Sequence, residues 1–254
     1  VADGPQKFGL FFDCPGKVTF DCGATDYEKF TFHSESPDFE IYIIEGDSVA
    51  EIVKEFRALI GQSYIPPKWA FGIGQSRWGY GSEADLLKVQ DGYRKNRLPL
   101  DMIYLDIDYM DNFKDFTVNR DSYRDFKECI TKLKKDKIRV IPIIDAGVKV
   151  EEGYDIYDEG IKKGYFCKDK DGKEFIVGVW PGKSVLPDFL NKDARKWFGD
   201  KYKILTDMGI EGFWNDMNEP ALFYSEKHKM EVFDQLKEYR DANVGLYANF
   251  AMKD

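Results

Sequence analysis

The chain has 254 residues, of which 43% are hydrophobic and 33% charged, and its formal net charge is −9. This balance is typical of a folded globular chain and argues against disorder. The chain is acidic, whereas nucleic acid needs clustered lysine and arginine, and no apolar run approaches the ~20 residues that span a bilayer. We therefore expect neither a nucleic-acid nor a membrane partner.

The four cysteines are Cys14, Cys22, Cys129 and Cys167, and they form no CxxC pair. With two histidines in the whole chain, a zinc site is unsupported, and we expect no metal and no other cofactor. Scattered cysteines in a chain of this length favour reduced thiols and a cytoplasmic protein, with a Cys14–Cys22 bridge as the alternative.

The first part of the chain, residues 1–65, has the pattern of antiparallel strands followed by a helix. KFGLFFD at 7–13 and FEIYIIE at 39–45 alternate apolar and polar positions between turn signals. Ser48 and Glu51 have capping-box spacing, and Gly61 suits the end of the helix they begin. We expect residues 1–65 to be the end of an antiparallel β-sandwich domain with a linking helix.

After Pro67 strands alternate with helices. Strands are predicted at 69–75, 101–108, 138–145 and 212–216, and helices at 82–96, 122–137 and 191–208, with a long loop and a hairpin near 165–179. Near-continuous apolar strands indicate a parallel sheet covered by helices. Four such units are half of an eight-stranded barrel or a small open sheet. The glycine-rich segment GIGQSRWGYG at 72–81, near the first predicted strand, lacks GxGxxG and a Walker lysine, which weakens the open nucleotide-binding alternative.

Three successive predicted strands end in a carboxylate: Asp106 and Asp108 after the second, Asp145 after the third, and Asp216 after the fourth. The C-terminal ends of parallel barrel strands line one mouth, which holds the chemistry. One strand-end aspartate is usually a turn residue or a helix cap, but three in register favour a site. Such carboxylates can bind a divalent metal, accept hydrogen bonds from substrate hydroxyls, or act as nucleophile and acid/base.

Aromatic side chains help to choose among these roles. Those at or just beyond strand ends, or in the long loop, are Trp78, Tyr80, Tyr109, Trp180 and Trp214. A sugar has apolar C–H faces and a rim of hydroxyls, so it suits rings combined with acceptor carboxylates. For Trp69, in a predicted strand, and Trp197, on a predicted helix, we expect core packing.

Four segments resemble glycoside hydrolase family 31, the α-glucosidases and their relatives. GFWNDMNEP at 212–220 resembles the family's nucleophile signature. The other three segments are PPKWAFGIGQSRWGY at 66–80, LPLDMIYLDIDYMDNFKDFTVN at 98–119 and VWPGKSVLPDFLN at 179–191. The resemblance implies an α/β fold, a partial (β/α)8 TIM barrel whose first four βα units span 66–222, with the start of an insertion at 223–254.

The resemblance also implies roles for individual residues. Asp216 would be the nucleophile of a retaining reaction that passes through a covalent glycosyl-aspartate, and Asp106 would bind hydroxyls of the glucose ring. The residues that match the lining of the sugar pocket are Trp78, Val148, Trp180, Trp214 and Met217. Structural roles are expected for Asp108, Asp111, Asp115 and Glu219.

The family's acid/base aspartate, a pocket arginine and a pocket histidine come from the second half of the barrel. This sequence stops at Asp254 before them, so we expect a fragment that is inactive or nearly so by itself. The expected substrate of the parent protein is a maltose- or isomaltose-like α-linked oligosaccharide. A half barrel has two open sheet edges, which predict self-association.

Two other readings stay open. In a metal-dependent barrel enzyme, Asp106, Asp145 and Asp216 would ligate Mg²⁺; in a non-catalytic carbohydrate-binding fragment, the same acids and rings would hold a sugar without cleaving it. Within the enzyme reading, a lyase, an α-xylosidase or a transglycosylase could share these motifs, and the sequence leaves α-1,4 and α-1,6 linkages both open.

Overall fold

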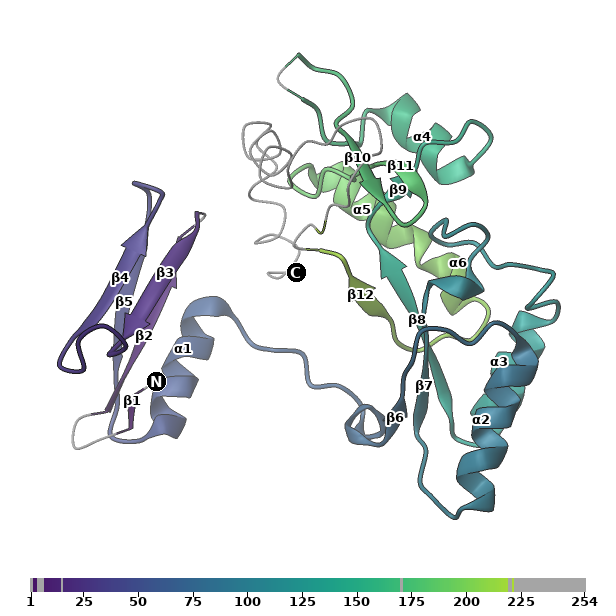
Figure 1. Cartoon of the computed structure of the whole chain (residues 1–254), viewed down its shortest axis with the longest axis horizontal. Helices are drawn as coiled ribbons and strands as arrows, with labels where there is room; N and C mark the ends of the chain where they lie inside the picture. The colour runs from purple at the N-terminus through teal and green to yellow at the C-terminus, as the bar shows by residue number, and fades with distance from the viewer. Residues whose placement is uncertain (1, 4–6, 15, 170, 219–220, 222–254) are drawn as a thin grey trace. The chain divides into compact units, whose positions relative to one another are not determined.

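The computed structural model describes residues 2–3, 7–14, 16–169, 171–218 and 221 (Figure 1). The chain divides into two compact units, Val1–Pro66 and Pro67–Asp254. The expected insertion at 223–254 lies outside the described residues.

The first unit contains antiparallel strands, as the alternating sequence predicts. One sheet has the order β1-β2-β5, and β3 pairs with β4 in a second. The bounds are β1 (Ala2–Asp3), β2 (Lys7–Asp13), β3 (Val18–Cys22), β4 (Phe30–Ser34) and β5 (Glu40–Glu45). The ring of Phe12 lies 5.0 Å from that of Phe20 and 4.6 Å from that of Phe32, centroid to centroid, so aromatic contacts link β2 to the β3–β4 hairpin.

Helix α1 (Val49–Ile60) follows, with the predicted caps at both ends. The Ser48 side chain accepts a hydrogen bond from the Glu51 N–H at 3.2 Å, and the Glu51 carboxylate accepts one from the Asp47 N–H at 2.9 Å. The first bond satisfies a donor of the first helical turn, which has no intrahelical partner, and the second ties the helix to the residue before its cap. Gly61 ends the helix at φ 99°, a conformation that residues with a Cβ adopt at a cost.

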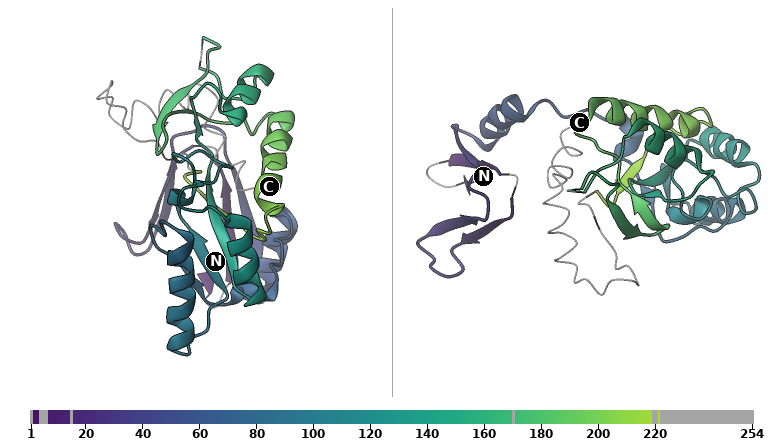
Figure 2. Two further views of the ribbon diagram at one scale, coloured as in Figure 1. Left: turned by 90° about the vertical axis from the view of Figure 1, so that its right-hand side faces the viewer. Right: turned by 90° about the horizontal axis from the view of Figure 1, so that it is seen from above.

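The second unit is built on a parallel sheet with the strand order β12-β8-β7-β6. The strands are β6 (Gly74–Gln75), β7 (Met102–Leu105), β8 (Arg139–Asp145) and β12 (Trp214–Asp216). The helices that connect them include α2 (Glu83–Lys95), α3 (Phe126–Lys135), α5 (Lys192–Lys201) and α6 (Lys203–Thr206). Parallel neighbours need such crossover connections, and α2 and α3 lie side by side along the sheet (Figures 1 and 2). The predicted alternation of strands and helices is confirmed.

The first strand of this sheet is shorter than predicted. Residues 68–71 form a 3₁₀ helix instead, in which the Ala70 N–H donates to the Pro67 carbonyl oxygen at 2.9 Å. Trp69 therefore lies in this 3₁₀ helix and not in a strand, half-buried with its ring 5.4 Å from the Arg139 guanidinium. Helix α3 also begins later than predicted, because the Asn119 side chain caps a turn just before it.

The segment predicted as a long loop contains more regular structure. It holds α4 (Asp155–Lys163) and a small antiparallel sheet of order β10-β11-β9. The bounds are β9 (Val148–Lys149), β10 (Ile176–Val179) and β11 (Gly182–Val185). The hairpin predicted near 165–179 is present at the antiparallel bridge between Lys168 and Glu174, where the Phe175 N–H donates to the Cys167 carbonyl oxygen at 2.9 Å, and β10 and β11 form a second hairpin after it. Helix α4 escaped prediction because a glycine, Gly160, occupies a position on its buried face.

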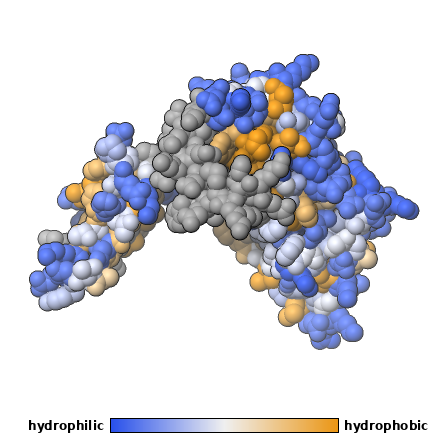
Figure 3. All heavy atoms as spheres, turned by 45° about the horizontal axis from the view of Figure 1, so that its top comes forward, coloured by the Kyte–Doolittle hydropathy of each residue, from blue (hydrophilic) through white to orange (hydrophobic). Residues whose placement is uncertain are grey.

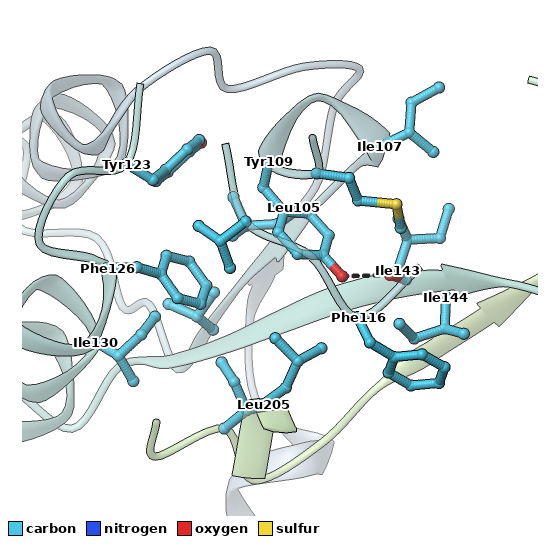
Figure 4. Packing of buried hydrophobic residues seen from close by; sticks show 14 of the residues in the cluster. Leu105, Ile107, Tyr109, Phe116, Tyr123, Phe126, Ile130, Ile143, Ile144 and Leu205 are labelled. Atoms are coloured by element: carbon cyan, nitrogen blue, oxygen red, sulfur yellow. Dashed lines mark hydrogen bonds between the residues drawn. The ribbon is translucent and has the colours of Figure 1, made fainter. Parts of the chain in front are cut away.

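The core of this unit lies between the parallel sheet and its helices (Figure 4). Helix α3 buries Phe126, Cys129, Ile130 and Leu133, the i, i+3, i+4, i+7 spacing of one helical face. The Tyr109 hydroxyl donates to the Ile143 carbonyl oxygen at 2.9 Å, which satisfies a polar group inside the cluster. Trp197 is buried on α5, as predicted.

Hydrophobic side chains also reach the surface of both units (Figure 3). None of the helices in the described part of the chain combines the length and apolarity needed to cross a membrane.

Candidate active site

The strand register brings three acids together at one edge of the parallel sheet. Asp216 is the register partner of Asp145 across β12 and β8. Asp106 directly follows Leu105, whose partner is Pro142 on β8, so Asp106 and Asp145 lie on the same face of the sheet. Because neighbouring strands are ~4.8 Å apart, these carboxyl groups share one small region at the C-terminal edge.

Two aromatic side chains lie one step below the acids on this face. Tyr104 precedes Asp106 by two residues and Trp214 precedes Asp216 by two, so each shares the face of its acid. Their ring centroids are 6.3 Å apart at an interplanar angle of 83°. Tyr104 was missed from the sequence, although its i, i+2 spacing to Asp106 in DMIYLDID is the signal that finds it.

Two tryptophans from distant segments meet in the loops. Trp78 follows β6 and is 64% exposed, and Trp180 lies in the turn between β10 and β11 and is 43% exposed. Their ring centroids are 5.9 Å apart. The pair presents exposed flat apolar surface of the kind on which a sugar ring stacks.

The other two predicted pocket residues, Met217 and Val148, have different environments. Met217 directly follows Asp216 with φ 63°, a left-handed conformation that costs a residue with a Cβ about 1–2 kcal/mol. It is partly buried against a small apolar cluster that includes Ala146. Val148 is fully buried in β9 as part of the main core. Pocket roles for both residues stay predictions.

Burial shapes the electrostatics of the strand-end acids. Burial raises the pKa of Asp106, and the charge of Asp216 raises it further. The hydrogen bond that the Ile107 N–H donates to the Asp106 carboxylate at 2.8 Å acts in the opposite direction and lowers the pKa. Burial together with the charges of Asp216 and Asp106 raises the pKa of Asp145 to about 7. The site therefore holds at least one carboxyl group that titrates near neutral pH.

The acids outside the strand ends have other partners. Asp115 is 1% exposed, and its Oδ1 accepts the Asp145 N–H at 3.2 Å. Burial, followed by the charge of Asp145, raises the Asp115 pKa well above its usual value. Asp111 pairs with Lys114 at 3.0 Å. Asp108 lies against Gly79, where a Cβ would overlap its carboxylate.

Glu219 lies outside the described residues. Within the described ranges, no group of three or more histidine, cysteine, aspartate or glutamate side chains is placed to hold a metal ion. All four cysteines are free, as the sequence predicts.

Acids at the carboxyl ends of parallel strands, set above aromatic rings, are an arrangement typical of TIM-barrel enzyme domains. Residues 63–250 match the family model described as the glycosyl hydrolases family 31 TIM-barrel domain. The chain belongs to glycosyl hydrolase family 31, and the resemblance seen in its sequence is confirmed.

The relatives it matches are longer proteins. The chain is 43% identical over 224 residues to alpha-glucosidase 2 of Bacillus thermoamyloliquefaciens, covering 88% of this chain and 28% of that protein. It is 33% identical over 242 residues to the alpha-glucosidase of Saccharolobus solfataricus, covering 95% of this chain and 34% of the relative.

Solved structures agree with this assignment. The family 31 dextranase of Flavobacterium johnsoniae, complexed with isomaltotriose, superposes with a TM-score of 0.81 at 26% identity, covering 96% of this chain and 30% of that one. The family 31 alpha-glucosidase of Bacteroides thetaiotaomicron gives a TM-score of 0.76 at 31% identity, with 93% and 41% covered.

Proposed function

We propose that this chain supplies the nucleophile side of the active site of a retaining α-glucosidase, which releases terminal non-reducing α-linked glucose. The observation that carries the proposal is the position of Asp216, half-buried at the end of β12, in register with Asp145 and beside the Trp214 position. The names of the relatives support the reaction class.

In the proposed reaction a carboxylate oxygen of Asp216 attacks the anomeric carbon as the glycosidic C–O bond breaks. A general acid protonates the departing oxygen, which leaves a covalent glucosyl-aspartate ester. Water, deprotonated by the same group, then attacks the anomeric carbon from the opposite side and frees Asp216, so the α configuration is retained.

The remaining side chains would bind and orient the sugar. The Asp106 carboxylate would accept hydrogen bonds from hydroxyls at the far end of the glucose ring. The exposed Trp78–Trp180 pair would stack on the sugar's apolar face. An isomaltotriose complex of a structural relative supports an α-linked oligosaccharide as the substrate class.

We further propose that the parallel strands are the first four units of an eight-stranded barrel, preceded by the end of a β-sandwich. The chain spans 28% and 34% of the two curated relatives, and we assign the general acid to the part of the parent protein outside it. General acid–base catalysis is worth about 10²–10⁴-fold, so this chain alone should hydrolyse an aryl α-glucoside poorly or not at all.

The proposal is tested on the parent protein that contains this chain. Asp216→Asn should lower kcat for an aryl α-glucoside by more than about 10³-fold, because it removes the attacking oxygen. Asp200→Asn, an exposed aspartate on α5 that pairs with Lys196, is the matched control and should leave kcat unchanged. Full turnover by Asp216→Asn would end the proposal.

A non-catalytic sugar site on this chain is the second candidate, and the exposed Trp78–Trp180 pair favours it. Saturation-transfer NMR of the 254-residue chain with maltose and isomaltose tests it. Binding should weaken in Trp180→Ala and persist in Tyr27→Ala, a control that removes an exposed ring in the first unit. Equal signals from both variants would exclude this candidate.

Self-association through the sheet edges is a further part of the proposal. Among the described strands, β6 and β12 each have one neighbour in the parallel sheet, and unpaired edges template further pairing. Light scattering of the isolated chain should show mass rising with concentration. A monodisperse monomer at high concentration would contradict this.

A cytoplasmic location is supported by the free thiols. Burial raises the pKa of the Cys129 thiol to about 11 and that of Cys167 to about 12. A thiol reagent should therefore label Cys14 and Cys22 in the folded chain but Cys129 and Cys167 after unfolding. Fewer than four reactive thiols in the unfolded, unreduced natural protein would contradict the reduced assignment.

A further inference from the structure

The carboxyl group of Asp145 is buried, and one of its oxygens lacks a hydrogen-bond donor among the described residues. The residue is 6% exposed, and its Oδ1 is buried with no hydrogen-bond partner in the described part of the chain. An ionised carboxylate in such a place loses its hydration and gains nothing in return. The proposed reaction gives this group no role.

Among the residues that the structure describes, the titratable groups that face Asp145 from neighbouring elements are acidic or are bonded to backbone oxygens. Asp216 lies beside it on β12, Asp106 follows β7, and Asp115 approaches from the loop before α3. None of the ion pairs between described residues includes any of these four acids. Like charges this close cannot all be ionised at low cost.

The two nearby tyrosine hydroxyls donate no hydrogen bond to these carboxyl groups. The Tyr154 hydroxyl donates a hydrogen bond to the Asp115 carbonyl oxygen at 2.7 Å, and the Tyr109 hydroxyl donates one to the Ile143 carbonyl oxygen at 2.9 Å. Both hydroxyls thus satisfy backbone acceptors. The unpartnered oxygens of Asp115 and Asp145 remain without a donor among the described residues.

We propose that Asp145 holds a proton in the resting site, and that its neutral carboxyl group acts as a positioning residue which lets Asp216 stay ionised beside it. The inference rests on the proposed role of Asp216 as nucleophile. A neutral Asp145 removes one of the negative charges next to the nucleophile, and its O–H becomes a donor in a region otherwise filled with acceptors.

Asp145 fits the role of the neutral carboxyl group better than the neighbouring acids do. Asp106 is half-buried, and its side chain accepts the Ile107 N–H, which favours the ionised form. Asp115 is deeper still, but strand register places Asp145 directly beside Asp216. The proton on Asp145 is therefore the one that sets the charge around the nucleophile.

The protonation state is measured on the 254-residue chain by infrared difference spectroscopy of wild type against Asp145→Asn. The protonated-carboxyl band of Asp145 should persist until the pH approaches about 7, while Asp200→Asn, an exposed control, should remove no such band. Should Asp145→Asn fail to fold, carbon-13 NMR of aspartate-labelled wild type gives the same titration. An Asp145 already ionised at about pH 5 would overturn the proposal.

The positioning role is measured on the parent protein through the acid limb of its kcat/KM profile, which reports ionisation of Asp216. Asp145→Asn should leave this limb in place and keep kcat within about threefold, because asparagine mimics the neutral carboxyl group. A limb that moves to lower pH would show that Asp145 was ionised, and would overturn the proposal. Absence of α-glucosidase activity in wild type would instead end the proposed function, and the spectroscopic titration would still decide the state of Asp145.

Discussion

Replacing Asp145 by asparagine should change how the stability of the chain depends on pH. In the folded chain the pKa of Asp145 is raised from 3.8 to about 7, chiefly by burial. Between these values the folded state keeps a proton that the unfolded state has lost, so stability falls as pH rises through this window. Below about pH 4 both states are protonated and this cost is absent; above about pH 7 it is fully present.

The size of the effect follows from the shift. A difference of about 3 pH units, at about 1.4 kcal/mol each, gives about 4 kcal/mol. This is an upper figure, because the side chain keeps 6% of its exposure and the neighbouring acids can take up part of the proton. Asparagine has no charge to bury, so the stability of Asp145→Asn should not fall with pH at this position.

Urea unfolding at about pH 5 and about pH 8 measures the effect. Between these two pH values only the part of the window from pH 5 to about 7 is crossed, so Asp145→Asn should gain about 2–3 kcal/mol of stability relative to wild type. For Asp200→Asn, on the exposed face of α5, the difference in stability from wild type should be the same at both pH values. A difference between Asp145→Asn and wild type that is the same at both pH values would refute the reasoning, because it would show that no proton is taken up at this position.

Two further predictions concern packing. Gly160→Ala should destabilise the chain by about 1–3 kcal/mol, because the new Cβ would overlap the buried ring of Phe166. Gly92→Ala on α2 should instead stabilise the chain by about 0.5–1 kcal/mol, because a Cβ there meets nothing within 4 Å. Equal effects in chemical denaturation would contradict this account of α4. Tyr109→Phe should cost about 1–2 kcal/mol by removing the bond to the Ile143 carbonyl, and an unchanged unfolding midpoint would show that this buried bond adds nothing.

The parallel sheet could be predicted because its two central strands, β7 and β8, are largely buried and form continuous apolar runs. The predicted N-terminal cap of α1 is present for a local reason, because Ser48 accepts a backbone N–H bond from the first turn that follows. Ser82 and Asn191 cap α2 and α5 in the same way. These signals need no knowledge of distant contacts.

Other elements depend on contacts that a linear pattern does not contain. The strand predicted at 69–75 was wrong for its first part, because apolar residues after Pro67 close a 3₁₀ turn. Helix α4 packs through Gly160 against Phe166, a contact that becomes visible only in three dimensions.

In the candidate site, too, local features could be predicted from the sequence and long-range contacts could not. The strand-end positions of Asp106, Asp145 and Asp216 followed from periodicity, and the register of the sheet brings them together. The partnership of Asp145 with Asp115 joins a strand to a distant loop, so no spacing in the sequence predicts it. The roles of the individual residues in catalysis remain predictions.

The central claim, that Asp216 is the nucleophile, is tested most directly by trapping the covalent intermediate. The parent protein would be incubated with a fluorinated α-glucosyl fluoride whose glycosyl-enzyme hydrolyses slowly, then digested and analysed by mass spectrometry. The account predicts one added glycosyl group on the peptide that contains Asp216, and none in Asp216→Asn. A label on another carboxylate, with Asp216 unmodified in an active enzyme, would contradict it.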